Sequence, residues 1–196
     1  IFMINMIPSV KQQEITSGFL KKNAIFFDDI NCDARVISAL KKLPYSKDGA
    51  DIKININGTS GEAYEIFINE NNITINADGS AGAFYAVQTL RQIFKNTEIP
   101  CLYIKDAPDF EHRGFYHDVT RGKVPTVKTL KKLIDDMAYY KLNSLQLYVE
   151  HTFEFEEYKD INEKFGYLTK ENSVKDLNGY FAMGAETREK AKKARE

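Results

Sequence analysis

The stretch Asp106-Ala-Pro-Asp-Phe-Glu-His-Arg-Gly-Phe-Tyr-His-Asp-Val-Thr-Arg121 decides the fold of the second half of this chain. Its proline marks a boundary. The residues from Arg113 to Thr120 are mostly apolar or aromatic, which is typical of a strand buried on both faces. Asp118 and Arg121 stand near the carboxyl end of that strand. Charged groups at such an end indicate a candidate site, because β/α barrels place their chemistry there.

A helix and a second strand follow. Pro125 suits the first turn of a helix, and residues 126–141 place apolar side chains on one face and charged side chains on the other. Asn143 is suited to close this helix in the left-handed conformation, and Ser144–Glu150 has the pattern of the next strand. Strand, helix and strand at this spacing predict a right-handed parallel crossover, the opening of a (β/α)8 TIM barrel.

The barrel that this pattern opens is incomplete in the chain. A β/α barrel takes about 200 residues or more, and the whole chain has 196. We therefore expect residues 109–196 to hold only the first β/α units of a TIM barrel, truncated before it closes. Residues after Asn172 do not continue the pattern.

The preceding part, residues 1–108, predicts a small α+β domain. It has a clear alternating strand at Asp51–Asn57 and a hairpin pattern around the polar turn at Glu70-Asn71. Two helices are expected, with Ser80 as the cap of the second. We predict one antiparallel or mixed sheet with both helices on one face. The expected strands are 10–14, 24–27, 51–57, 64–69, 72–76 and 101–105, and the expected helices are 33–43 and 80–94.

Composition excludes several classes of partner. The formal net charge of −1 favours neither a nucleic acid nor a membrane surface as a partner, and no apolar run is long enough to span a bilayer. The two cysteines, Cys32 and Cys101, cannot form a disulfide framework or a structural zinc site, and we expect both to be buried. No cofactor or metal motif is present. No targeting signal is visible, so extracellular and cytoplasmic locations both stay open.

Arg121 and Glu150 form the candidate binding pair. The carboxyl ends of parallel neighbouring barrel strands open onto the same face, and an arginine offers a planar fork of donors suited to sugar hydroxyls. The alternative is an ion pair that braces two loops. Asp118 is close enough in sequence to support Arg121, and His151 follows Glu150 at the second strand end. His112 and His117 are expected to be packed, structural side chains.

These segments resemble glycoside hydrolase family 20, the β-N-acetylhexosaminidases. The resemblance lies in residues 106–121, in the helix that ends in Lys141-Leu-Asn143, and in Leu145-Gln-Leu-Tyr-Val-Glu150. The unit before them, with its Gly-Ala-Phe-Tyr-Ala-Val-Gln-Thr-Leu90 helix, is similar to the small domain that precedes the barrel in that family. The likeness covers roughly residues 50–154.

The resemblance implies a retaining exo-hydrolase that removes terminal β-linked N-acetylhexosamine from glycans. In this family the substrate's own 2-acetamido oxygen is the nucleophile, and an Asp-Glu pair on a later strand orients it and supplies the general acid. By position, Arg121 matches the family's arginine that binds sugar hydroxyls, and Glu150 matches its pocket acid. No cofactor is implied.

The chain departs from the family pattern in two ways. Glu150 stands where Asp is typical, and His151 stands where a second Asp is common. The catalytic Asp-Glu dipeptide does not occur in the sequence, so no catalytic residue is assigned. Two alternatives stay open at this stage: a non-catalytic accessory module of a carbohydrate-active protein, and a hydrolase of a neighbouring barrel family such as the α-glucuronidases.

Overall fold

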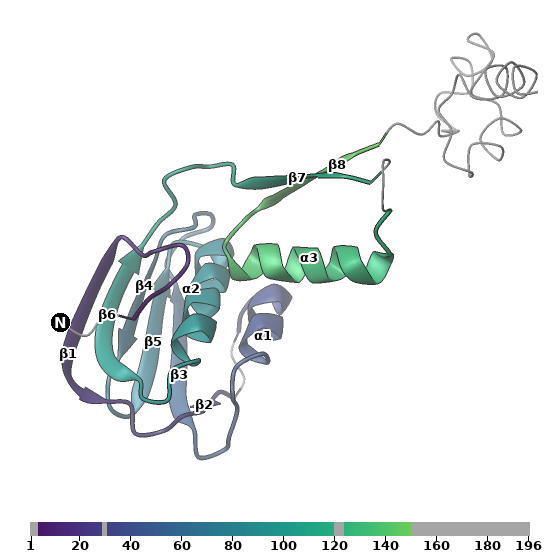
Figure 1. The fold of residues 1–196 in the computed structure, drawn as a ribbon. Helices are drawn as coiled ribbons and strands as arrows, with labels where there is room; N and C mark the ends of the chain where they lie inside the picture. Colours follow the sequence, from purple (N-terminus) through teal and green to yellow (C-terminus); the bar gives the residue numbers. More distant parts are fainter. Residues whose placement is uncertain (1–3, 29–30, 120–123, 150–196) are drawn as a thin grey trace, which may run out of the picture. The chain divides into compact units, whose positions relative to one another are not determined.

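The computed structural model describes residues 4–28, 31–119 and 124–149 (Figure 1). These residues fall into two compact units. We call residues 4–115 with 131–144 the sheet unit, and residues 116–130 with 145–149 the strand-pair unit, in both cases counting described residues only. The elements in chain order are β1 Gln12–Phe19, β2 Ile25–Phe26, α1 Ala34–Leu40, β3 Ala50–Ile56, β4 Tyr64–Ile68, β5 Asn72–Ala77, α2 Ser80–Ile93, β6 Pro100–Asp106, β7 Gly114–Asp118, α3 Val127–Tyr139 and β8 Ser144–Tyr148.

The sheet unit contains a six-stranded mixed sheet in the order β1-β6-β4-β5-β3-β2. Strand β3 runs parallel to both β2 and β5, and the remaining pairs are antiparallel. The predicted hairpin is confirmed in β4 and β5. Its turn is held by the Asn69 side-chain oxygen, which accepts hydrogen bonds from the backbone N–H groups of Asn71 at 3.0 Å and Asn72 at 2.9 Å. This is the turn chemistry that makes asparagine common between strands.

Helices α1 and α2 cover one face of the sheet, as predicted for the two helices of the first part of the chain (Figure 1). Helix α2 packs on β3, β4 and β5, and α1 packs beside α2. The core between them is aliphatic. Ile66 and Ile104 have no exposed surface, and Leu90 of α2 is equally buried. Fully burying a side chain of this size stabilises the fold by about 1.5–3 kcal/mol, so the alternating isoleucines of the strands account for much of the stability of this layer.

The start of α2 differs from the sequence expectation. Gly79, not Ser80, is the N-cap, and no side chain caps the helix. The reason is a close approach of backbones: a Cβ atom at Gly79 would lie 2.9 Å from the backbone of Ser60. One turn further on, a Cβ at Gly82 would lie 2.4 Å from the carbonyl oxygen of Ala63, and the Gly82 N–H donates to the Gly61 carbonyl at 3.1 Å. Glycine at position 82 therefore lets α2 approach the chain that enters β4.

We expect Gly82→Ala to destabilise the chain by about 1–3 kcal/mol, the usual cost of forcing an extra group into a packed site. Helix propensity alone would predict the opposite sign, because alanine is favoured over glycine in a helix interior by about 1 kcal/mol. Urea unfolding followed by circular dichroism measures the difference. Ala81→Gly, in the same turn, serves as the control, because it measures how much the helix itself prefers alanine over glycine. A Gly82→Ala variant that equals or exceeds the wild type in stability contradicts the close approach.

The end of α3 corrects a second expectation. The left-handed residue is Lys141, with φ of 62°, and it is the only non-glycine residue with positive φ in the described part of the chain. The sequence pattern predicts that conformation at Asn143. Its side chain instead links two loop segments: Oδ1 accepts from the Arg113 N–H at 2.9 Å, and Nδ2 donates to the Glu111 carbonyl at 2.7 Å. The asparagine amide is used for tertiary bonds, and the turn falls two residues earlier.

Strand β7 is less buried than its composition predicts. Phe115 and Tyr116 are 41% and 54% exposed, so the expectation of a strand buried on both faces is wrong for the described residues. The reason is that β8 is the only strand paired with β7 in the described ranges.

Among the described residues, no helix is both long enough and apolar enough to cross a membrane.

Candidate functional site

The candidate site begins with the pairing of β7 and β8. In the sheet unit, the Arg113 carbonyl accepts a hydrogen bond from the Asn143 N–H at 2.9 Å, and in the strand-pair unit the Val119 N–H donates to the Tyr148 carbonyl at 3.2 Å. Arg113, just before the start of β7, thus pairs with the start of β8, and Val119, just after the end of β7, pairs with the end of β8. The two strands are therefore parallel neighbours, as predicted. Parallel neighbours end at the same edge of a sheet.

In the sequence, the predicted site residues come at or shortly after the ends of β7 and β8. Asp118 is the last residue of β7 and is half-buried. Arg121 comes three residues after it, and Glu150 and His151 come directly after Val149. Arg121, Glu150 and His151 lie outside the described residues, so their predicted meeting stays a prediction. The described part of the edge is aromatic as well as acidic, because the rings of Tyr116 and Tyr148 lie 5.9 Å apart across the two strands.

A buried charge cluster lies at the end of β6 in the sheet unit. The ammonium group of Lys141 donates to Asp106 Oδ2 at 2.9 Å and to the Tyr64 hydroxyl at 2.8 Å. The Tyr64 hydroxyl in turn donates to Asp106 Oδ2 at 2.7 Å and lies 2.7 Å from the hydroxyl of Thr89. All four residues are less than a tenth exposed. We call Tyr64, Thr89, Asp106 and Lys141 the buried cluster.

Burial shifts the proton equilibria of this cluster. Loss of hydration lowers the pKa of Lys141, and the hydrogen bond and charge of Asp106 oppose that shift. Burial and the neighbouring Asp106 charge raise the pKa of the Tyr64 hydroxyl. Tyr64 therefore stays protonated and serves as a donor. A cluster in which each charge has a partner is suited to hold β6 against the end of α3, and this is a structural role.

Arg113 forms a second link in the same unit. Its guanidinium donates to Glu62 Oε2 at 2.5 Å, to the Lys141 carbonyl at 2.8 Å and to the Phe110 carbonyl at 2.7 Å. It also lies 5.4 Å from the centre of the Tyr85 ring. One side chain thus ties the segment before β7 to the segment after α3. A cavity of about 260 Å³ lies beside these groups and is bounded by Tyr64, Asp106, Arg113 and Lys141 among others.

Sequence reasoning missed the buried cluster, although one signal was available. Leu102, Ile104 and Asp106 share one face of β6, and this face is buried. A carboxylate on a buried face requires a partner. That partner, Lys141, lies 35 positions further along the chain, and no local pattern points to it.

Metal binding finds no support in the described residues. Across 4–28, 31–119 and 124–149, no group of three or more His, Cys, Asp or Glu side chains is arranged to hold an ion. Cys101 is buried and Cys32 is half-buried, and both are free thiols. The pKa of each thiol is raised, chiefly by burial, so neither is set up as a nucleophile.

Comparison with known proteins gives two matches to family models. Residues 4–107 match glycosyl hydrolase family 20, domain 2, and residues 110–188 match glycosyl hydrolase family 20, catalytic domain. Beta-hexosaminidase B of Pseudoalteromonas piscicida is 34% identical over 108 residues, which cover 53% of this chain and 14% of that protein. N,N'-diacetylchitobiase of Vibrio harveyi is 40% identical over 90 residues, covering 44% of this chain and 10% of that protein.

Solved structures give the same picture. A family 20 exo-β-N-acetylglucosaminidase of Vibrio harveyi, solved in complex with N-acetylglucosamine, superposes with a TM-score of 0.59 at 27% identity. The match covers 81% of this chain and 28% of that one. A glycoside hydrolase family 20 β-N-acetylglucosaminidase superposes with a TM-score of 0.58 at 30% identity, and the match covers 74% of this chain and 29% of that one. The chain spans between 10% and 19% of the length of the first five curated relatives.

Proposed function

We propose, because this chain belongs to glycosyl hydrolase family 20, that the protein carrying it together with a complete catalytic domain removes terminal β-linked N-acetylhexosamine from glycans. The match of residues 110–188 to the catalytic domain model carries the proposal. The names of the relatives, which are hexosaminidases or a chitobiase, disfavour the two alternatives of an accessory module and an α-glucuronidase.

We propose that β7, α3 and β8 form the first unit of the TIM barrel. Two observations support this: the parallel pairing of β7 with β8, and the position of both strands within the segment that matches the catalytic domain. On this proposal the α+β domain comprises residues 1–108, and the barrel begins within residues 109–196.

We assign substrate binding to the edge where β7 and β8 end. Arg121 donates to sugar hydroxyls through its planar guanidinium, and Glu150 accepts from others. His151 lines the same pocket, and Asp118 braces Arg121. The support is the parallel pairing of β7 with β8, because parallel neighbouring strands end at the same edge of a sheet. Glycan hydrolysis needs such a set of fixed donors and acceptors to orient the sugar ring before the bond breaks.

The proposed reaction is substrate-assisted. The acetamido oxygen of the sugar attacks its own anomeric carbon, the leaving oxygen takes a proton from a general acid, and water then opens the cyclic intermediate. No Asp-Glu dipeptide occurs in these 196 residues, so we assign no catalytic acid to this chain. Its residues bind and orient the sugar.

The test is turnover of an aryl β-N-acetylglucosaminide by the protein with its complete catalytic domain. We expect steady release of the aryl group. The 196-residue chain alone is expected to be inactive. The matched aryl β-glucoside lacks the acetamido group, so it is expected to react far more slowly if the mechanism is substrate-assisted. Absence of turnover on every β-hexosaminide tried rejects the proposed function, and equal rates on the two substrates reject the mechanism alone.

A further inference from the structure

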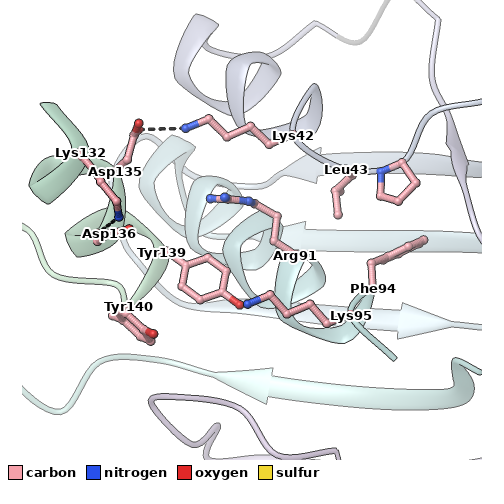
Figure 2. A pocket seen from close by; sticks show the side chains of 11 residues that line it. Lys42, Leu43, Arg91, Phe94, Lys95, Lys132, Asp135, Asp136, Tyr139 and Tyr140 are labelled. Carbon is pink, nitrogen blue, oxygen red and sulfur yellow. Dashed lines mark hydrogen bonds and ion pairs between the residues drawn. The ribbon is translucent and has the colours of Figure 1, made fainter. Parts of the chain in front are cut away.

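A cavity of about 640 Å³ lies in the sheet unit between the end of α2, the last two turns of α3 and the segment that follows α1 (Figure 2). It is separate from the buried cluster and shares no lining residue with the smaller cavity beside Arg113. Its volume falls in the range of small-molecule sites, about 300–1,000 Å³. None of the roles proposed above uses it.

The cavity carries more positive than negative charge. Four cationic side chains line it, against two carboxylates. Lys42 pairs with Asp135 at 2.9 Å and Lys132 pairs with Asp136 at 2.6 Å, so both carboxylates are engaged with a lysine (Figure 2). The two remaining cations are Arg91 and Lys95 of the α2 end, and in the described part of the chain neither has a salt bridge to a carboxylate.

Arg91 and Lys95 lie around a single ring. The Arg91 guanidinium is 5.0 Å and the Lys95 ammonium 4.6 Å from the centre of the Tyr139 ring (Figure 2). Arg91 also donates to Gln88 at 2.6 Å, which fixes its position. Arg91 lies in the last turn of α2 and Lys95 follows the end of that helix, so two like charges face the same ring and repel each other. The π-face of a tyrosine attracts each cation but carries no net charge. Asp135, whose pKa is lowered by its hydrogen bond from Lys42 and further by the Arg91 charge, is already paired with that lysine. An anion in the cavity would offset part of the remaining positive charge.

Apolar rings border this charge pair. Tyr140 is 44% exposed, and the half-buried Phe94 lies along α2 beside Lys95. Aromatic side chains of this kind offer flat apolar surface at low entropic cost, which suits the C–H faces of a sugar ring. The cavity thus combines an excess of two positive charges with aromatic walls, and this combination fits an acidic sugar better than a bare inorganic ion.

We propose that this cavity is an anion-binding subsite that takes the sulfate or carboxylate group of an acidic saccharide between Arg91 and Lys95, with its ring against Tyr140 and Phe94. The anionic half of the proposal rests on the charges alone. The choice of a saccharide rests on the proposed glycan hydrolysis. The two are separable, because the subsite can be measured by binding to the chain without any turnover.

The experiment titrates the 196-residue chain with four probes, followed by amide shifts in NMR and by calorimetry. The probes are N-acetylglucosamine 6-sulfate, glucuronate, inorganic sulfate and neutral N-acetylglucosamine. We expect saturable binding of the two acidic sugars with shifts centred on Arg91, Lys95 and Tyr139, weaker binding of sulfate, and none of the neutral sugar at this cavity. Lys95→Gln and Arg91→Gln should each weaken acidic-sugar binding by about tenfold or more, as loss of a charge-assisted contact does.

Matched controls separate the cavity from general effects. Lys53→Gln removes an exposed positive charge from β3 and should leave binding unchanged, while Lys95→Arg keeps the charge and should retain it. Sulfate stabilises most proteins by exclusion from their surface, so a thermal shift counts only if Lys95→Gln removes it. Binding of sulfate as tight as that of the acidic sugars overturns the saccharide assignment. Absence of saturable binding, or equal binding by Lys95→Gln, Arg91→Gln and the wild type, overturns the subsite.

Discussion

Lys141→Met is expected to lower the free energy of unfolding by about 3–5 kcal/mol, the usual cost of leaving a buried charge without its partner. Methionine fills nearly the same space and has the same difficulty with a positive φ, so the change isolates the charge. Asp106 would keep its hydrogen bond from Tyr64 but lose the ammonium group that lies 2.9 Å away. Urea unfolding of the 196-residue chain, followed by circular dichroism, measures the loss.

The second partner completes this test. In the double variant Lys141→Met, Asp106→Asn, no charge remains in the buried cluster, and we expect it to be more stable than the sum of the two single changes predicts. Lys128→Met, which alters an exposed lysine at the start of α3, should stay within about 0.5 kcal/mol of the wild type. A small effect of Lys141→Met, equal to that of Lys128→Met, would show that the buried cluster does not hold the fold.

Arg121→Ala in the protein with a complete catalytic domain is expected to lower kcat/KM by about 10²-fold, or about 2.7 kcal/mol of transition-state stabilisation. The physical reason is loss of the planar donor fork that orients the sugar. Steady-state kinetics on an aryl β-N-acetylglucosaminide measures it, and the split between KM and kcat tells whether the contact acts in the bound substrate or only in the transition state.

Two comparisons distinguish sugar binding from a bracing ion pair. Arg121→Lys keeps the charge but not the fork, so it should recover only part of the activity if the residue binds hydroxyls. Thermal unfolding of Arg121→Ala should match that of the wild type. If Arg121→Ala loses stability together with activity while Arg121→Lys restores both, the alternative of two loops braced by Arg121 and Glu150 replaces the substrate-binding role.

Local sequence patterns predicted most elements of the fold. The alternation of Ile52, Ile54 and Ile56 marks β3, and the asparagine turn marks the β4–β5 hairpin. The apolar face of residues 127–138 marks α3. These signals are readable because the periods of helices and strands, and the chemistry of tight turns, depend only on neighbouring residues. The parallel pairing of β7 with β8 followed from the same patterns, since a helix between two strands favours that connection.

Contacts between distant segments were not readable in this way. The pairing of Asp106 with Lys141, the left-handed turn at Lys141 instead of Asn143, and the uncapped start of α2 at Gly79 each depend on a second piece of chain. So does the pair of cations around Tyr139, which comes from a different helix. A buried carboxylate needs a partner wherever one can reach it, and a backbone that passes within a few ångströms of another excludes a side chain there. Periodicity carries no information about such meetings, because they exist only once the sheet has brought its strands and helices together.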